Sequence, residues 1–231
     1  MADLHPTISV HHLNNSRSQR VLWLLEELGV PYDIVRYERD PKTMLAPKSL
    51  RKVHPLGKSP VITVDGETIA ETGVIVEYLC DRFDAGKLSP ENDRRPMSSE
   101  RRRWLYWLHY AEGSAMPLLL LKLVFSKMPT QVPWPMRFLT GLISKQGQSD
   151  FIDPQLRLHL DYWEAELGQT GWFAGPDFGA ADVMMSFPVE GASKAFAFRN
   201  TWPNLQDFLS RIHSRAAYRR ALEQGGPYAL G

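Results

Sequence analysis

The sequence predicts two parts of different fold class, an α/β part at residues 1–84 and an all-α part at residues 97–231. Three observations support this division. Short β-prone runs alternate with helical periodicity in the first part, and no strand pattern follows residue 96. Residues 85–96, AGKLSPENDRRP, combine glycine, two prolines and many charges, which is typical of a linker between domains.

The α/β part is predicted to run in the order β-α-β-α-β-β-α. Leu22, Leu25 and their apolar neighbours recur at helical spacing, and Gly29 followed by Pro31 ends that helix. Asp65-Gly66 forms a tight hairpin turn between two short strands. A strand, a helix and a strand at this spacing indicate a right-handed βαβ unit. The expected elements, in order, lie at residues 7–10, 21–28, 32–37, 47–53, 61–64, 68–70 and 73–83.

The second part reads as helices throughout. Residues 98–125 form one long helical stretch, which we expect to be interrupted near Pro117, and residues 128–135 hold two prolines typical of a loop. A further helix begins at Trp202-Pro203. A clear amphipathic helix carries apolar residues at i, i+4, i+7 and i+11. These residues are Leu156, Leu160, Trp163 and Leu167.

Composition bounds the class of protein. With 231 residues, 43% hydrophobic and 11% aromatic, the chain has ample material for a packed core. The formal net charge is +1, and neither part is basic enough to indicate a nucleic acid or an anionic membrane as partner. Absence of a GxSxG or GxGxxG motif excludes the serine-hydrolase and dinucleotide-binding interpretations.

The single cysteine limits the redox and metal chemistry. Cys80 alone cannot form an internal disulfide, a CxxC pair or a zinc cluster, and its neighbours predict a buried position. Met184-Met185 is interpreted as core, so no metal site is predicted. The N-terminus lacks a signal-peptide pattern, and the apolar run at residues 115–125 has about half of the ~20 residues of a membrane span. We therefore predict a cytoplasmic protein without a membrane span.

The stretch from Val53 to Thr72 has the features of a site for a peptide-like ligand. An X-Pro bond, Ser59-Pro60, lies in the loop before the third strand. Glu71 and Thr72, a carboxylate beside a hydroxyl, lie where the next helix begins. Loop backbone offers N–H and C=O groups, and a helix start offers N–H groups and the positive end of a dipole.

Three segments carry a family resemblance: SRSQRVLWLLEELGVPY, HPLGKSPVITVDG and ETGVIVEYL. They resemble the N-terminal half of the glutathione transferases, most of all the microbial serine-type branch with an NNSRS-like turn. The resemblance implies an α/β thioredoxin-like N-terminal domain plus an all-α C-terminal domain. It also implies glutathione as co-substrate, a small hydrophobic electrophile as second substrate, a role in detoxification and a homodimer.

The resemblance assigns the glutathione-binding residues. Pro60 matches the cis-proline of the family, which turns the Ser59 backbone toward the cysteinyl part of glutathione. Glu71 matches the group that takes the α-ammonium, and the Thr72 hydroxyl with the helix-start amides takes the α-carboxylate. The glycyl carboxylate needs a cation. Lys58 is the first candidate and Lys42 a weaker one.

Ser16 stands where this fold places the residue next to the glutathione sulfur. A hydroxyl donor at a helix N-terminus stabilises a thiolate, so Ser16 is expected to donate a hydrogen bond and not to act as nucleophile. Asn15 competes for this role through its amide, and Arg17 adds positive charge. Since a serine stands in the cysteine position and Cys80 lies elsewhere, thiol–disulfide exchange through the enzyme is disfavoured.

The second substrate is expected between the two parts, where ligand pockets commonly form. The acceptor stays open among aryl halides, quinones, hydroperoxides and aryl ethers. The alternatives to a transferase are a glutathione-dependent peroxidase and a non-catalytic binding or scaffold protein. The predicted electrophile wall is His12, Tyr106, Trp107, Tyr110, Glu112 and Ser114.

The segment 171–190 also resembles the family, with Gly179 and Asp182 in a capping box that opens a buried helix.

Overall fold

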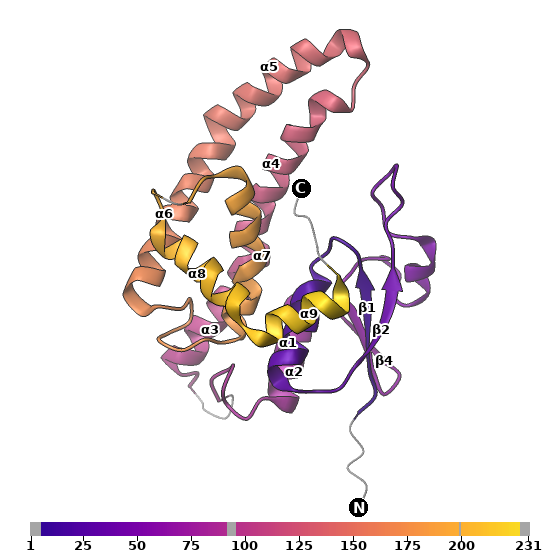
Figure 1. Cartoon of the computed structure of the whole chain (residues 1–231), viewed down its shortest axis with the longest axis vertical. Coiled ribbons are helices and arrows are strands. Elements are labelled where there is room, and N and C mark those ends of the chain that lie inside the picture. The colour runs from indigo at the N-terminus through magenta and orange to yellow at the C-terminus, as the bar shows by residue number, and fades with distance from the viewer. Residues whose placement is uncertain (1–5, 92–95, 199, 227–231) are drawn as a thin grey trace, which may run out of the picture.

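The computed structural model describes residues 6–91, 96–198 and 200–226, and shows a four-stranded sheet followed by helices (Figure 1). The sheet order is β2-β1-β3-β4. Strand β1 is parallel to β2 and antiparallel to β3, and β3 is antiparallel to β4. This topology confirms the predicted thioredoxin-like part. The strands are β1 Ile8–Leu13, β2 Asp33–Tyr37, β3 Val61–Val64 and β4 Glu67–Ala70.

Helix α1, Ser18–Leu28, joins β1 to β2 and makes the predicted βαβ unit. It ends as expected at Gly29, whose φ of 67° is in the left-handed region that glycine adopts readily. The hairpin turn also has the expected form, because Asp65 and Gly66 both have positive φ, 49° and 89°. The short helix predicted before the sheet's third strand is the 3-10 helix Lys48–Lys52.

Helix α2, Thr72–Phe83, follows β4 and closes the α/β part. Its buried side, which includes Ile75, Leu79 and Cys80, belongs to the same hydrophobic core as α1 and the sheet. Cys80 is 1% exposed, as predicted, and burial is the main cause that raises the pKa of its thiol to about 12. The predicted linker 85–96 includes residues 92–95, which lie outside the described residues.

The described residues after β4 form helices and connections only. The expected interruption of the long helix is a π-helical segment, Ala111–Ala115, just before Pro117. Two 3-10 turns, Met128–Thr130 and Trp134–Met136, occupy the predicted loop. The main helices are α3 Ser99–Tyr110, α4 Met116–Lys127, α5 Arg137–Gly147, α6 Asp153–Thr170, α7 Ala180–Ala195, α8 Pro203–Ser214 and α9 Ala216–Gly225. No helix among the described residues combines the length and apolar character needed to cross a membrane.

Helix α7 runs through the centre of the helical part and is buried over most of its length. It begins with the predicted capping box. Asp182 Oδ2 accepts the Gly179 N–H at 2.9 Å, and Oδ1 accepts the Phe173 N–H at 2.9 Å. The predicted inward residues of α6, namely Leu156, Leu160, Trp163 and Leu167, are all buried.

Helix α9 returns to the α/β part and packs along α1 (Figure 1). The Trp23 and Tyr218 rings meet edge to face with centroids 5.1 Å apart. Arg215 on the connection before α9 makes a bidentate ion pair with Glu27 of α1. The end of the helical part therefore covers the helix that starts at the predicted catalytic turn.

Candidate active site

The predicted catalytic turn lies between the end of β1 and the start of α1. The Asn14 N–H donates to the Tyr37 carbonyl at 3.1 Å, and Asn15 has a φ of 50°. The Arg39 guanidinium donates to the carbonyls of Asn14 and Asn15 at 3.1 and 3.2 Å. Arg39 therefore holds the turn from outside, as a charged donor bonded to carbonyl groups.

The Ser16 side chain points into a small hydrogen-bonded group. It is 5% exposed, and its Oγ lies 2.7 Å from Ser18 Oγ and accepts the Ser18 N–H at 3.2 Å. The Ser18 hydroxyl in turn lies 2.9 Å from Nδ1 of His12. Burial is the main cause that lowers the pKa of His12, which favours the neutral imidazole.

The loop before β3 reaches this turn from the other side. The Ser59-Pro60 peptide bond is cis. The Ser59 hydroxyl donates to the His11 carbonyl at 3.1 Å and lies 3.4 Å from Ser16 Oγ. The structure thus brings Ser16 next to the Ser59-Pro60 loop, although Ser16 and Ser59 are 43 residues apart in the sequence.

A cleft of about 550 Å³ runs along this junction. Glu71 and Thr72 line it where α2 starts, and Arg17 and Lys58 line it with Ser59 and Pro60. Lys42 is exposed and is not among the described residues that line the cleft. The cleft also has cationic or ionisable residues that the sequence did not single out: Arg39, Arg51 and His54.

Glu112, in the π-helical segment, ties the helical part to the catalytic turn. Its carboxylate makes ion pairs with Arg17, at 3.2 Å, and with the buried Arg20. Burial alone would raise the pKa of Glu112, but the charges of Arg20 and Arg17 outweigh burial and keep that pKa lowered. Glu112 is therefore ionised at neutral pH and fixes the Arg17 guanidinium at the edge of the cleft.

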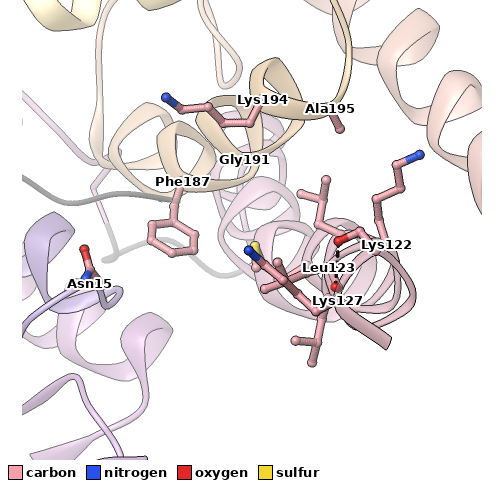
Figure 2. A pocket seen from close by; sticks show the side chains of 12 residues that line it. Asn15, Lys122, Leu123, Lys127, Phe187, Gly191, Lys194 and Ala195 are labelled. Atoms are coloured by element: carbon pink, nitrogen blue, oxygen red, sulfur yellow. Dashed lines mark hydrogen bonds between the residues drawn. The ribbon is translucent and has the colours of Figure 1, made fainter. Parts of the chain in front are cut away.

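A second cavity, of about 370 Å³, lies between α4 and α7 (Figure 2). Its walls are mainly apolar, with Leu119 and Leu123 from α4 and Phe187 from α7. Asn15 of the catalytic turn lines one side of it. Leu120 lines both this apolar cavity and the cleft, so the two adjoin near the turn.

The residues predicted as electrophile wall lie elsewhere in the described part of the chain, and apart from Glu112 in the cleft they line neither cavity. Trp107 is fully buried and stacks on Tyr162, with Tyr106 packed edge to face against it. The Tyr110 hydroxyl accepts the Trp163 indole N–H at 3.0 Å and also bonds to His159. His12 is buried beside Ser18, and Ser114 lies half-buried in the π-helical segment.

The apolar cavity uses residues that the sequence did not single out. Phe187 lies in a run of α7 that is buried on every side, so periodicity gives no signal for one cavity-facing residue. On α4, Leu119 and Leu123 follow i, i+4 spacing, which is a signal for a shared face but not for what covers that face. Only the fold shows that α4 and α7 leave a space between them.

The cleft and cavity define a class of protein: a thioredoxin-like domain with a cleft at its cis-proline, joined to a helical domain that adds an apolar pocket. Comparison with known proteins identifies the family. Residues 16–82 match the model of the glutathione S-transferase N-terminal domain. Glutathione S-transferase 3 of Schizosaccharomyces pombe is 33% identical over 217 residues, which cover 94% of this chain and 87% of that protein. Glutathione S-transferase 1 of Saccharomyces cerevisiae is 32% identical over 95% of each chain.

Solved structures agree. A glutathione S-transferase from Actinobacillus pleuropneumoniae has a TM-score of 0.76 and 27% identity, covering 97% of this chain and 94% of that one. The transferase URE2P6 of Phanerochaete chrysosporium, solved with oxidised glutathione, has a TM-score of 0.73 and 20% identity over 96% of each chain. The chain belongs to the glutathione S-transferase family, so the predicted family, fold and enzyme class are confirmed.

Proposed function

We propose that this protein binds glutathione in the cleft and transfers it, as a thiolate, to an apolar electrophile held in the adjoining cavity. The observation that carries the proposal is that one turn, Asn15-Ser16-Arg17, reaches both spaces. Arg17 lines the cleft, Ser16 lies 3.4 Å from the cleft residue Ser59, and Asn15 lines the apolar cavity. A thiol held at this turn lies within reach of a molecule in either space.

The cleft has the groups that a tripeptide with two carboxylates and one ammonium requires. The ammonium pairs with Glu71, and the neighbouring carboxylate binds the Thr72 hydroxyl and the first amides of α2. The Ser59 backbone pairs with the central residue of the tripeptide. Lys58 takes the glycyl carboxylate, and Arg17, held by Glu112, adds positive charge.

Activation of the thiol is proposed to come from Ser16. Lowering the pKa of a thiol from about 8.5 by two units takes roughly 2.7 kcal/mol of preferential thiolate stabilisation. A hydrogen bond to a charged group contributes about 1.5–3 kcal/mol, so one hydroxyl and the helix start together suffice. For Ser16 to donate to sulfur, the Ser18 hydroxyl must supply the proton between the two serines. Asn15 is the competing donor.

The reaction is a nucleophilic substitution or addition at an electrophilic carbon. The thiol proton leaves to solvent on ionisation, and the sulfur forms the new bond. In a substitution the leaving group departs with its electron pair, and in an addition the electron pair of the broken π bond takes a proton from solvent. Phe187 and Leu119, which are buried, keep water from the reacting carbon, and together with Leu123 they orient the apolar body of the substrate. Detoxification by this conjugation, a homodimer and the serine-type branch remain predictions of the family resemblance, and a cytoplasmic location remains a prediction from the sequence. Light scattering on the purified protein tests the homodimer.

The test measures glutathione binding by calorimetry and the pKa of the bound thiol by ultraviolet absorbance. Wild type is compared with Ser16→Ala, Asn15→Ala and the control Ser210→Ala, whose hydroxyl bonds only within α8 on the exposed surface. We expect Ser16→Ala to raise the thiol pKa and to lower turnover of an aryl halide about 10- to 100-fold, the value of one charged hydrogen bond. The control retains wild-type values.

Three outcomes separate the alternatives. If Asn15→Ala loses the low thiol pKa and Ser16→Ala keeps it, Asn15 is the donor. If wild type binds glutathione and reduces cumene hydroperoxide faster than it conjugates any aryl halide, the enzyme is a peroxidase. If wild type binds no glutathione, the assignment of the cleft is wrong.

A further inference from the structure

The charge distribution around the apolar cavity is one-sided. Three lysines line its rim, Lys122 and Lys127 from α4 and Lys194 from α7, and no Asp or Glu among the described residues lines it. The sequence extends this bias, because residues 113–149 contain four Lys and Arg and no Asp or Glu. An apolar space with a rim of one sign attracts molecules that have an apolar body and the opposite charge.

The three lysines differ in what they do. Lys122 pairs with Asp153, and its side chain runs away from Phe187 (Figure 2). The side chains of Lys127 and Lys194 extend over the cavity from opposite walls, on the side of Phe187 (Figure 2). Both residues are exposed, whereas Phe187, which lines the same cavity, is 8% exposed. The ammonium groups thus stand at the mouth of the cavity, and the apolar surface lies beneath.

We infer that the second substrate is an anionic amphipathic electrophile, whose carboxylate binds Lys127 and Lys194 while its apolar, reactive end points to Asn15. The inference rests on the proposed function, since it names the substrate class of the same site. The orientation of the bound substrate follows from the residues that line the cavity. Asn15, which precedes Ser16 in the sequence, lines one side of the cavity beyond Phe187, and the exposed Lys127 and Lys194 line it from α4 and α7. A molecule anchored by its charge at the rim presents its other end to the thiolate.

Two lysine ammonium groups at the rim are suited to bind a carboxylate. A carboxylate keeps most of its hydration at an exposed rim, so the attraction carries only a small desolvation cost. The cavity volume of about 370 Å³ is within the range of small-molecule sites. A neutral electrophile gains only the apolar contacts, and an electrophile that carries a cation is repelled.

Paired substrates isolate the effect of charge on turnover. The pair is 4-chloro-3,5-dinitrobenzoate and the corresponding carboxamide, which share ring, reacting carbon and leaving chloride. In both, sulfur bonds to the ring carbon and chloride leaves with the electron pair. For each, kcat/KM is divided by the uncatalysed rate with glutathione, which removes the electronic difference between the substituents. The ratio of acid to amide after this correction is the acid preference.

We expect an acid preference of about 3- to 10-fold for wild type, as for two partly exposed ion pairs. Lys127→Gln and Lys194→Gln each lower this preference, mainly by raising the KM of the acid, and the double variant abolishes it. Lys122→Gln keeps it, because that ammonium is paired with Asp153. Raising the ionic strength from 50 to 500 mM lowers the preference in wild type by screening.

A binding measurement does not depend on turnover. Calorimetry compares decanoate with decanamide on protein saturated with S-methylglutathione, and we expect decanoate to bind more tightly in wild type but not in the Lys127→Gln, Lys194→Gln double variant. Conjugation of the carboxamide without an acid preference overturns the inference and leaves the proposed function standing. If the two variants change only the melting temperature, the lysines serve the C-terminal ends of α4 and α7, and the inference is likewise wrong.

Discussion

The Ser16 and Ser18 hydroxyl oxygens lie 2.7 Å apart, so one hydrogen bond joins them. Ser16 is the residue proposed to activate the thiol, and solvent does not reach its partner Ser18. Ser18 is 0% exposed and links Ser16 to Nδ1 of the buried His12. Which atoms donate in the two hydrogen bonds His12–Ser18 and Ser18–Ser16 decides whether the Ser16 proton points inward or toward the cleft. Ser18 is therefore a positioning residue for Ser16.

We expect Ser18→Ala to lower the free energy of unfolding by about 1–3 kcal/mol, because it leaves the buried His12 nitrogen without its partner. The same variant should change the pKa of bound glutathione more than the KM for glutathione, since Ser18 does not line the cleft. Urea denaturation measures the first effect and ultraviolet titration the second. Ser210→Ala, on the surface of α8, serves as control and stays within about 0.5 kcal/mol of wild type.

Glu112 makes the free energy of unfolding depend on pH. Its pKa in the folded state is lowered from 4.5, so its ion pairs with Arg17 and Arg20 stabilise the protein above about pH 4.5 and are lost as the pH falls below that value. We expect the stability difference between wild type and Glu112→Gln to be present at pH 7 and to shrink toward pH 3.5. Urea midpoints from pH 3.5 to 8 measure it. A difference that grows on acidification contradicts the assignment.

Gly225 at the end of α9 has no space for a side chain. A Cβ there would lie 2.5 Å from Gln19 Oε1 and 2.7 Å from Leu22 Cδ1, both on α1. We expect Gly225→Ala to cost about 1–3 kcal/mol, a loss of roughly 2–12 °C in melting temperature for a protein of this size. Gly141→Ala is the matched control, because nothing lies within 4 Å of a Cβ at that position in α5. This control should be neutral or slightly stabilising.

Asp182 holds two backbone N–H groups at the start of α7. Asp182→Ala leaves the Gly179 and Phe173 donors without a partner in the core, and we expect a loss of about 2–4 kcal/mol in unfolding free energy. Asp207→Ala removes an exposed carboxylate that pairs with Arg211 on α8 and should cost less than about 1 kcal/mol. Equal losses in the two variants contradict a capping role for Asp182.

Local chemistry made much of the α/β part predictable. Gly29 and Asp65-Gly66 are residues whose backbone preferences define a helix end and a hairpin turn without help from the rest of the fold. The Ser59-Pro60 and Glu71-Thr72 positions follow from the family resemblance, and both lie on one cleft. These signals are short in sequence, so one chain suffices to find them.

The wall of the apolar cavity could not be predicted in the same way. Trp107 and Tyr110 are aromatic and near the domain junction, but their rings pack on Tyr162 and Trp163, which come from another helix. Phe187 lies in a helix that is buried all round, so no pattern marks its cavity-facing position. Which apolar residue packs and which one lines a space depends on the distance between helices, and a single sequence does not encode that distance locally.

The packing of α9 on α1 also sets an order of events during synthesis. Glu27 leaves the ribosome 188 residues before its ion-pair partner Arg215. At 5–20 residues per second, the nascent chain waits about 10–40 s with the Trp23 face of α1 uncovered. The part of the chain that lines most of the cleft is thus made first, and its aromatic face stays open to non-native contacts until α9 is made.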